Sequence, residues 1–148
     1  MSHKSAIEKI IDAYTGTIIR LYVRIRFHIL RRRFLDEIGQ YLPKQGKFLD
    51  IGCGFGLFSL YYAMERPGAQ LHGIDLNGKR IAHARQASEH LGLTNTHYRE
   101  GSAVGLALSE SFDAIYMLDI VHHIPPASVA PLIHSLHQSL PIGGRLLI

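Results

Sequence analysis

From residue 47 onward, short apolar runs alternate with longer stretches of helical periodicity. The apolar runs predict β-strands at 47–51, 70–75, 96–100, 112–118 and 144–148. Helices are predicted between them at 56–65, 78–91 and 126–139, and residues 102–110 predict only a short helical turn. Strands that alternate with helices in this way are typical of βαβ units around a parallel sheet.

The first 45 residues follow a different pattern. Residues 5–14 and 17–42 predict two helices, the second of which ends before Pro43 and Gly46. Within it, "LYVRIRFHI" at 21–29 also alternates apolar and basic positions, which is a strand pattern, but we favour the helix. We therefore expect a basic helical segment at 1–45, followed by an α/β domain at 46–148.

The composition is that of an ordinary globular unit. With 148 residues, 47% of them hydrophobic, the chain can bury a core of its own. No apolar stretch reaches the roughly 18 residues that a membrane-spanning helix needs. The single cysteine, Cys53, excludes an internal disulfide framework and a cysteine-based zinc site. Because no cleavable signal segment is recognisable, a cytoplasmic location is expected.

The excess positive charge lies in the first third of the chain. Through Lys47 there are ten Lys and Arg against four Asp and Glu, whereas the remainder has six against eight. This pattern indicates either a solvated helix face or a surface for an anionic partner, with an anionic membrane favoured over nucleic acid because the arginines alternate with aliphatic residues. Six arginines lie within fourteen positions: Arg20, Arg24, Arg26, Arg31, Arg32 and Arg33.

A glycine-rich turn follows the first predicted strand, in "FLDIGCGFGLFSL" at 48–60. Gly52, Gly54 and Gly56 leave the backbone open to close approach by an adenosine-bearing ligand at the start of a helix. The dinucleotide fingerprint G-x-G-x-x-G is not matched, because Leu57 stands where its last glycine would fall.

Asp75 stands at the end of the next predicted strand. Neighbouring parallel strands share one crevice at their carboxyl ends, so this carboxylate is expected to accept hydrogen bonds from ribose hydroxyls. The alternative is that Asp75 caps the helix that begins near Gly78.

These stretches resemble a known family. "FLDIGCGFGLFSLYYA" and "LHGIDLN" resemble the first two motifs of class I S-adenosylmethionine-dependent methyltransferases, and "FDAIYMLDIVHHIP" and "LPIGGRLLI" are similar to their fourth- and fifth-strand motifs. The resemblance covers about residues 46–148. It implies a Rossmann-like, doubly wound parallel sheet in the order 3-2-1-4-5 and methyl transfer from S-adenosylmethionine, with S-adenosylhomocysteine as product and no metal.

Family members usually continue with strands six and seven, which this chain lacks. The resemblance therefore implies a C-terminally truncated domain. Either the chain is a fragment, or a partner or a second copy in a homo-oligomer covers the edge of the fifth strand.

The resemblance also implies the cofactor-binding residues. Asp50 and the glycine loop would hold the methionine end, Asp75 the ribose, and Leu76 the adenine ring. A serine and an alanine take the place of the Asp-Ala pair that commonly meets the adenine amino group, and the end of strand four would pass near the sulfonium. The full set is Asp50, Gly52, Cys53, Gly54, Gly56, Asp75, Leu76, Ser102, Ala103, Met117 and Leu118.

The acceptor side is implied less fully. His122 and His123 are the general-base hypotheses, since imidazole titrates near neutral pH, although both also fit structural roles. Tyr14 and Tyr22 are expected to contribute to the substrate pocket. An Arg-rich segment with Ile, Phe and Tyr suits an interfacial helix, which favours a small-molecule or lipid-like acceptor and a peripheral membrane location.

Two other functions remain open at this point. The chain would be a non-catalytic cofactor-binding or membrane-associated module if the short sheet cannot support catalysis. A nicotinamide-dependent oxidoreductase shares the fold but fits the glycine spacing poorly. Binding of S-adenosylhomocysteine without a response to NAD(H) would separate the methyltransferase from the oxidoreductase.

Overall fold

A parallel five-stranded sheet forms the centre of the molecule. The computed structural model describes residues 3–30, 32–118 and 120–148. Strand order is β3-β2-β1-β4-β5, and every neighbouring pair is parallel, as the resemblance implied. The strands are β1 (Gly46–Ile51), β2 (Ala69–Asp75), β3 (Thr96–Glu100), β4 (Ala114–Tyr116) and β5 (Arg145–Leu147).

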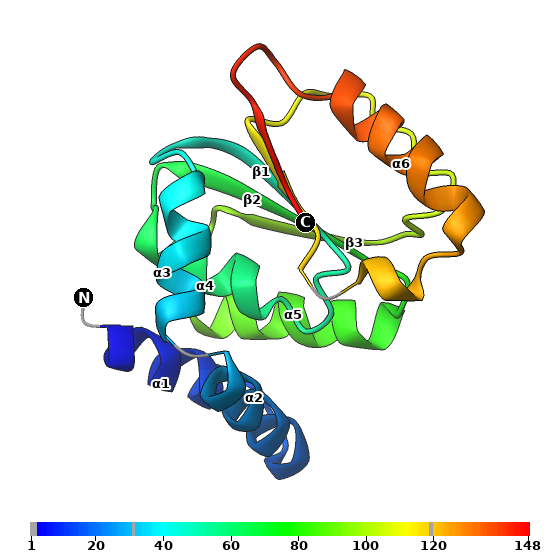
Figure 1. Ribbon diagram of the computed structural model, residues 1–148. Coiled ribbons are helices and arrows are strands. Elements are labelled where there is room, and N and C mark those ends of the chain that lie inside the picture. Colours follow the sequence, from blue (N-terminus) through cyan, green and yellow to red (C-terminus); the bar gives the residue numbers. More distant parts are fainter. Residues whose placement is uncertain (1–2, 31, 119) are drawn as a thin grey trace.

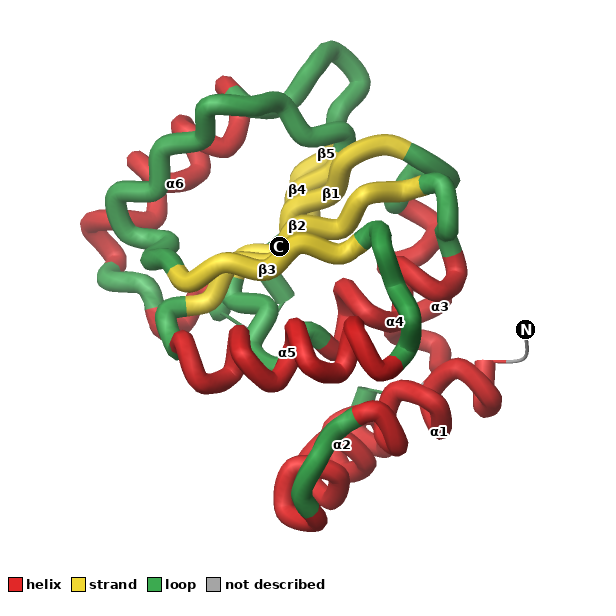
Figure 2. Tube along the Cα trace, turned by 180° about the vertical axis from the view of Figure 1, so that it is seen from behind, coloured by secondary structure: helices red, strands yellow, loops and turns green. Residues whose placement is uncertain are grey.

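Helices cover both faces of this sheet, with α6 on one side and α1–α5 on the opposite side (Figures 1 and 2). They are α1 (His3–Ala13), α2 (Thr17–Ile29), α3 (Arg32–Tyr41), α4 (Leu57–Glu65), α5 (Gly78–His90), the short 3-10 helix η1 (Val121–His123) and α6 (Pro126–Gln138). Residues 101–110 contain turns and no helix, so the short helical turn predicted there is absent.

The alternation of side chains along each strand divides the core in two. On β1, Phe48 belongs to the cluster beneath α1–α5, whereas Leu49 belongs to the cluster beneath α6. On β4, Tyr116 and Ile115 divide in the same way. The strands are therefore buried on both faces, as expected for parallel strands between helical layers.

The prediction of one helix over 17–42 is wrong. The structure has two helices instead, and Leu30 leaves helical geometry with φ −77° and ψ 75°. At 100° per residue, a straight helix would turn Leu35 about 80° away from Phe27. The break allows both residues to be buried, at 1% and 5% exposure.

The N-terminal helices share a core with the sheet. Ala6 and Ile10 of α1 are fully buried in the cluster that contains Phe48. His90 Nδ1, near the end of α5, lies 2.7 Å from the carbonyl oxygen of Ala13. Among the described residues, no helix is long and apolar enough to cross a membrane.

Candidate active site

The glycine turn is fixed to the end of β2 by backbone hydrogen bonds. The N–H groups of Gly52 and Cys53 both donate to the carbonyl oxygen of Ile74, at 2.7 and 3.1 Å. Gly52, Gly54 and Gly56 have φ angles of 77°, 56° and 80°, which side chains rarely tolerate. The residue type at these three positions is therefore required by the turn itself.

Asp75 joins this turn to the start of α5. Its Oδ2 accepts a hydrogen bond from the Gly54 N–H and its Oδ1 accepts one from the Asn77 N–H, both at 2.8 Å. A carboxylate offers about four lone-pair positions, so two remain after these bonds. The cap of α5 is Asn77, whose Oδ1 accepts from the N–H groups of Lys79 and Arg80, and the alternative role of Asp75 as helix cap is wrong.

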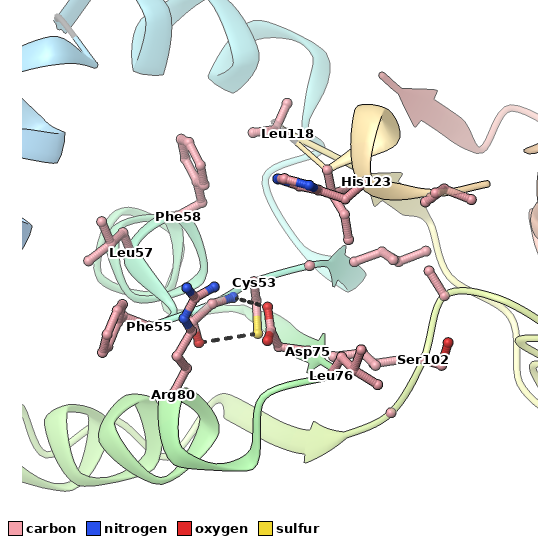
Figure 3. A pocket seen from close by; sticks show the side chains of 18 of the residues that line it. Cys53, Phe55, Leu57, Phe58, Asp75, Leu76, Arg80, Ser102, Leu118 and His123 are labelled. Atoms are coloured by element: carbon pink, nitrogen blue, oxygen red, sulfur yellow. Dashed lines mark hydrogen bonds between the residues drawn. The ribbon is translucent and has the colours of Figure 1, made fainter. Parts of the chain in front are cut away.

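A pocket of about 380 Å³ opens beside this turn, within the usual size range of small-molecule sites. Figure 3 shows Asp75, Leu76 and Ser102 on one side of it, with Leu118 and His123 across from them. Of the residues that the sequence indicated, the pocket is lined by Gly52, Cys53, Gly54, Asp75, Leu76, Ser102, Ala103, Leu118, His123 and Tyr22.

Four other indicated residues lie outside that lining. Asp50 and Met117 are buried at 2% exposure, Asp50 behind the turn and Met117 in the cluster beneath α6. Gly56 packs against Tyr98 and Ala84. His122 is exposed next to His123, with ring centroids 3.9 Å apart.

Tyr14 also lies outside the lining and supports the turn. Its hydroxyl donates to the carbonyl oxygen of Phe55 at 2.6 Å, and its side chain is 1% exposed. The Phe55 ring lies 5.2 Å from the ring of Tyr22 and 5.9 Å from that of His83. The N-terminal helices therefore pack directly on the glycine turn.

Burial raises the pKa of two groups at the turn. The pKa of Asp50 is raised to about 7 by burial, although the Ser59 hydroxyl, which donates to Asp50 Oδ2 at 2.6 Å, opposes the shift. Burial also raises the pKa of the Cys53 thiol, helped by the negative charges of Asp50 and Asp75. The Cys53 thiol is therefore held in its protonated form, in which it is a weak nucleophile.

Among the lining residues that the sequence did not assign to the pocket are Arg26, Phe55, Phe58 and Arg80. The sequence could have indicated Phe55 and Arg80 as lining residues, because Phe55 lies within the glycine turn and Arg80 lies in the first turn of the helix that follows Asp75. The guanidinium of Arg80 lies 5.7 Å from the centre of the Phe55 ring. No feature of the sequence could have indicated Arg26, since its position depends on how α2 packs.

The sheet order and the pocket at the carboxyl ends of β1 and β2 define the Rossmann-like class of nucleotide-binding proteins. The family model described as "Methyltransferase domain" matches residues 48–144. The chain belongs to this methyltransferase family.

Individual relatives agree with this assignment. A protein named ubiquinone biosynthesis O-methyltransferase from Paracidovorax citrulli is 41% identical over 104 residues, which are 68% of this chain and 42% of that protein. The protein of the same name from Pseudomonas syringae pv. tomato is 34% identical over 120 residues, 79% of this chain and 48% of that protein. The chain thus spans less than half the length of these two relatives.

The fold also matches a solved structure. Coclaurine N-methyltransferase, bound to N-methylheliamine and S-adenosylhomocysteine, has a TM-score of 0.72 over 78% of this chain and 34% of that protein. Its sequence is 18% identical, so this comparison concerns the fold alone.

Proposed function

We propose that this chain binds S-adenosylmethionine in the pocket beside the glycine turn and transfers its methyl group to a small-molecule acceptor. The observation that carries the proposal is the coincidence of the family-matched glycine turn, Asp75 and Leu76 in one cavity of about 380 Å³. When bound, the sulfonium supplies an activated methyl group. The chain has only to orient the two reactants and exclude water.

Each cofactor residue has a role in this proposal. The two remaining lone-pair positions of Asp75 accept the ribose hydroxyls, and the 73% exposed Leu76 packs on the adenine ring. Gly54 leaves room for the methionine end, since a Cβ placed there would have only Asp75 Oδ2 near it, at 4.0 Å. Asp50 acts from behind the turn.

The remaining contacts complete the binding site. Ser102 and Ala103 lie beside the adenine, and Leu118 faces the reacting sulfur. Cys53 and Gly52 supply backbone to the wall, whereas Gly56 and Met117 act through packing, because both lie outside the lining.

The acceptor site is proposed to lie between Tyr22 and His123. Both line the pocket, from α2 and η1 respectively. The relatives named as O-methyltransferases support an oxygen acceptor in a molecule related to ubiquinone biosynthesis. An oxygen nucleophile must lose its proton, and the imidazole of His123 is proposed to accept it.

His122 provides the matched control for this base. It is adjacent, chemically identical and outside the pocket lining. Loss of turnover in His123→Gln, with S-adenosylhomocysteine affinity unchanged and with His122→Gln active, would support a base at position 123. Equal turnover in both variants would remove the base from the mechanism.

The direct test of the cofactor site is calorimetry with S-adenosylhomocysteine. Replacing Asp75 by Ala removes two hydrogen bonds to a charged acceptor and should weaken binding by roughly 2 to 4 kcal/mol, about 30- to 1000-fold. Asp36→Ala, on the exposed face of α3, is the control and should bind normally. Unchanged affinity in Asp75→Ala, or stronger binding of NAD(H), would contradict the proposal.

Catalysis needs a second measurement. Formation of S-adenosylhomocysteine with a phenolic acceptor should occur in the wild type and be lost in Asp75→Ala. Binding without any turnover would favour the non-catalytic module.

We further propose two surfaces for partners. Within the segment Arg20–Arg33, the exposed Arg24 and Arg33 are proposed to face an anionic membrane, whereas Arg20 donates to the carbonyl oxygens of Tyr14 and Asp12, and Arg31 lies outside the described residues. Among the described strands, β5 pairs only with β4, so its other edge is proposed to bind a partner or a second copy of the chain. Light scattering would test for a homo-oligomer, with a concentration-independent monomer mass as the contrary result.

A further inference from the structure

Helix α2 presents a continuous apolar stripe to solvent. Its members recur every three or four residues, so they lie along one face of the helix. They are Ile18, Leu21, Tyr22, Ile25 and Ile29, with exposed fractions of 85, 57, 43, 49 and 62%. Soluble proteins rarely leave so many large apolar side chains together in water unless the surface binds something.

The opposite face of α2 attaches the helix to the protein. Val23 and Phe27 are buried at 0% and 5% exposure, and Ile19 and Leu30 pack beside them. Apart from Tyr22, whose ring contacts Phe55, the exposed stripe is therefore not needed to hold α2 in place. Both overall views show α2 at the outer edge of the helical layer, away from the sheet (Figures 1 and 2).

Basic residues border the stripe on both sides. At 100° per residue, Arg24 and His28 lie on one flank and Arg26 on the other. The helix contains no Asp or Glu. An apolar stripe between cationic flanks is the arrangement found in helices that lie in the headgroup region of anionic membranes. Isologous pairing with a second copy would bring like charges together, which disfavours that occupant.

We propose that α2 lies in the plane of an anionic lipid bilayer, with Ile18, Leu21 and Ile25 inserted into its surface. Tyr22 belongs both to this stripe and to the lining of the active-site pocket, and Arg26 also lines the pocket. The pocket mouth therefore meets the bilayer surface. Resting on the proposed function, this arrangement makes the acceptor an amphiphile that enters past Tyr22 from the membrane.

The test is co-sedimentation of the full chain with phosphatidylcholine vesicles that contain or lack phosphatidylglycerol. Wild type should bind only the anionic vesicles, and added salt should release it. Ile18→Ser with Ile25→Ser should reduce partitioning at least tenfold, because each isoleucine loses its apolar burial. Arg24→Glu should reduce it about fivefold or more.

Two control variants match these changes in chemistry. Ile142→Ser alters a fully exposed isoleucine in another part of the molecule, and Lys44→Glu reverses an exposed charge before β1. Both should sediment like the wild type. Ile18 and Ile25 are exposed and lie outside the pocket lining, so their replacement should leave the midpoint of thermal unfolding and the affinity for S-adenosylhomocysteine unchanged.

The outcomes separate this inference from the cofactor site. Normal S-adenosylhomocysteine binding without vesicle binding overturns the membrane surface and leaves the cofactor proposal intact. Vesicle binding that the stripe variants do not affect also overturns it. The inference would also be overturned if the wild type self-associates and does not bind vesicles, and if Ile25→Ser abolishes the self-association. The stripe would then bind a second copy of the chain.

Discussion

Two of the three glycines of the turn, Gly54 and Gly56, should respond differently to replacement by alanine. All three have positive φ, so each substitution costs about 1 to 2 kcal/mol from the left-handed backbone alone. At Gly54 little is added, because the nearest atom to a new Cβ is Asp75 Oδ2, at 4.0 Å. At Gly56 the Cβ would lie 2.9 Å from Tyr98 Oη and 3.0 Å from Ala84 Cβ. Overpacking there adds about 1 to 3 kcal/mol.

Gly54→Ala should therefore lower the free energy of unfolding by about 1 to 2 kcal/mol, and Gly56→Ala by about 2 to 5 kcal/mol. For S-adenosylhomocysteine binding we expect the larger loss of affinity in Gly54→Ala, because Gly54 lines the pocket and Gly56 does not. Urea denaturation and calorimetry on the same preparations measure both quantities.

Gly92→Ala supplies the control for backbone strain. Gly92 has φ 65°, lies at the end of α5 outside the pocket, and has no atom within 4 Å of the position that a Cβ would take. Its alanine variant should lose stability like Gly54→Ala but bind S-adenosylhomocysteine normally. Equal stability of Gly54→Ala and Gly56→Ala would refute the packing argument, and normal binding by Gly54→Ala would refute its role in the site.

Three further substitutions test the surroundings of the turn. Asp50→Asn should flatten the pH dependence of the free energy of unfolding. The pKa of Asp50 is about 7 in the folded protein and 3.8 ordinarily, so its contribution to stability is fully present below pH 4 and is lost as the pH rises through 7. The difference in free energy of unfolding between Asp50→Asn and wild type, measured by urea denaturation, should therefore widen between pH 4 and 7. Tyr14→Phe should cost about 1 kcal/mol in urea denaturation by removing the hydroxyl that donates to Phe55, and no loss would show that this bond is replaced by water. Asn95→Leu should cost about 2 to 3 kcal/mol in the same assay, because its Nδ2 donates to the carbonyl oxygens of Ala63, Arg66 and Ala69 at 3.2, 3.4 and 2.9 Å. A neutral effect would mean that leucine packing offsets the loss of these bonds.

The parallel sheet was predictable because its signals are local. Apolar runs, the glycine turn and Asp75 each fix backbone geometry within a few residues, and β3 was predicted at the bounds observed. The strand expected at 112–118 is longer than the observed β4, which spans Ala114–Tyr116. Phe112 and Met117 lie outside the strand but are buried as strand residues are. Burial alone does not distinguish these positions from strand residues.

The N-terminal third was less predictable because packing decides it. Neither proline nor glycine marks the end of α2. The reason why the helix stops is seen only in the packing, where Leu35 is buried beside Tyr62 and its carbonyl oxygen accepts a hydrogen bond from the Tyr62 hydroxyl at 2.9 Å. Likewise, nothing local distinguishes Arg26, which lines the pocket, from Arg24, which does not.

The double attachment of Asp75 has a consequence for how ligand is captured. Because its carboxylate already holds the backbone at Gly54 and Asn77, the turn acquires its shape during folding. Ligand arrival then requires little ordering of the chain at this point, so less conformational entropy is lost on association. Under the proposed function, discrimination between similar nucleosides therefore rests on the fit to a preformed wall, and a ligand that lacks ribose hydroxyls leaves the free lone pairs of Asp75 without their proposed donors.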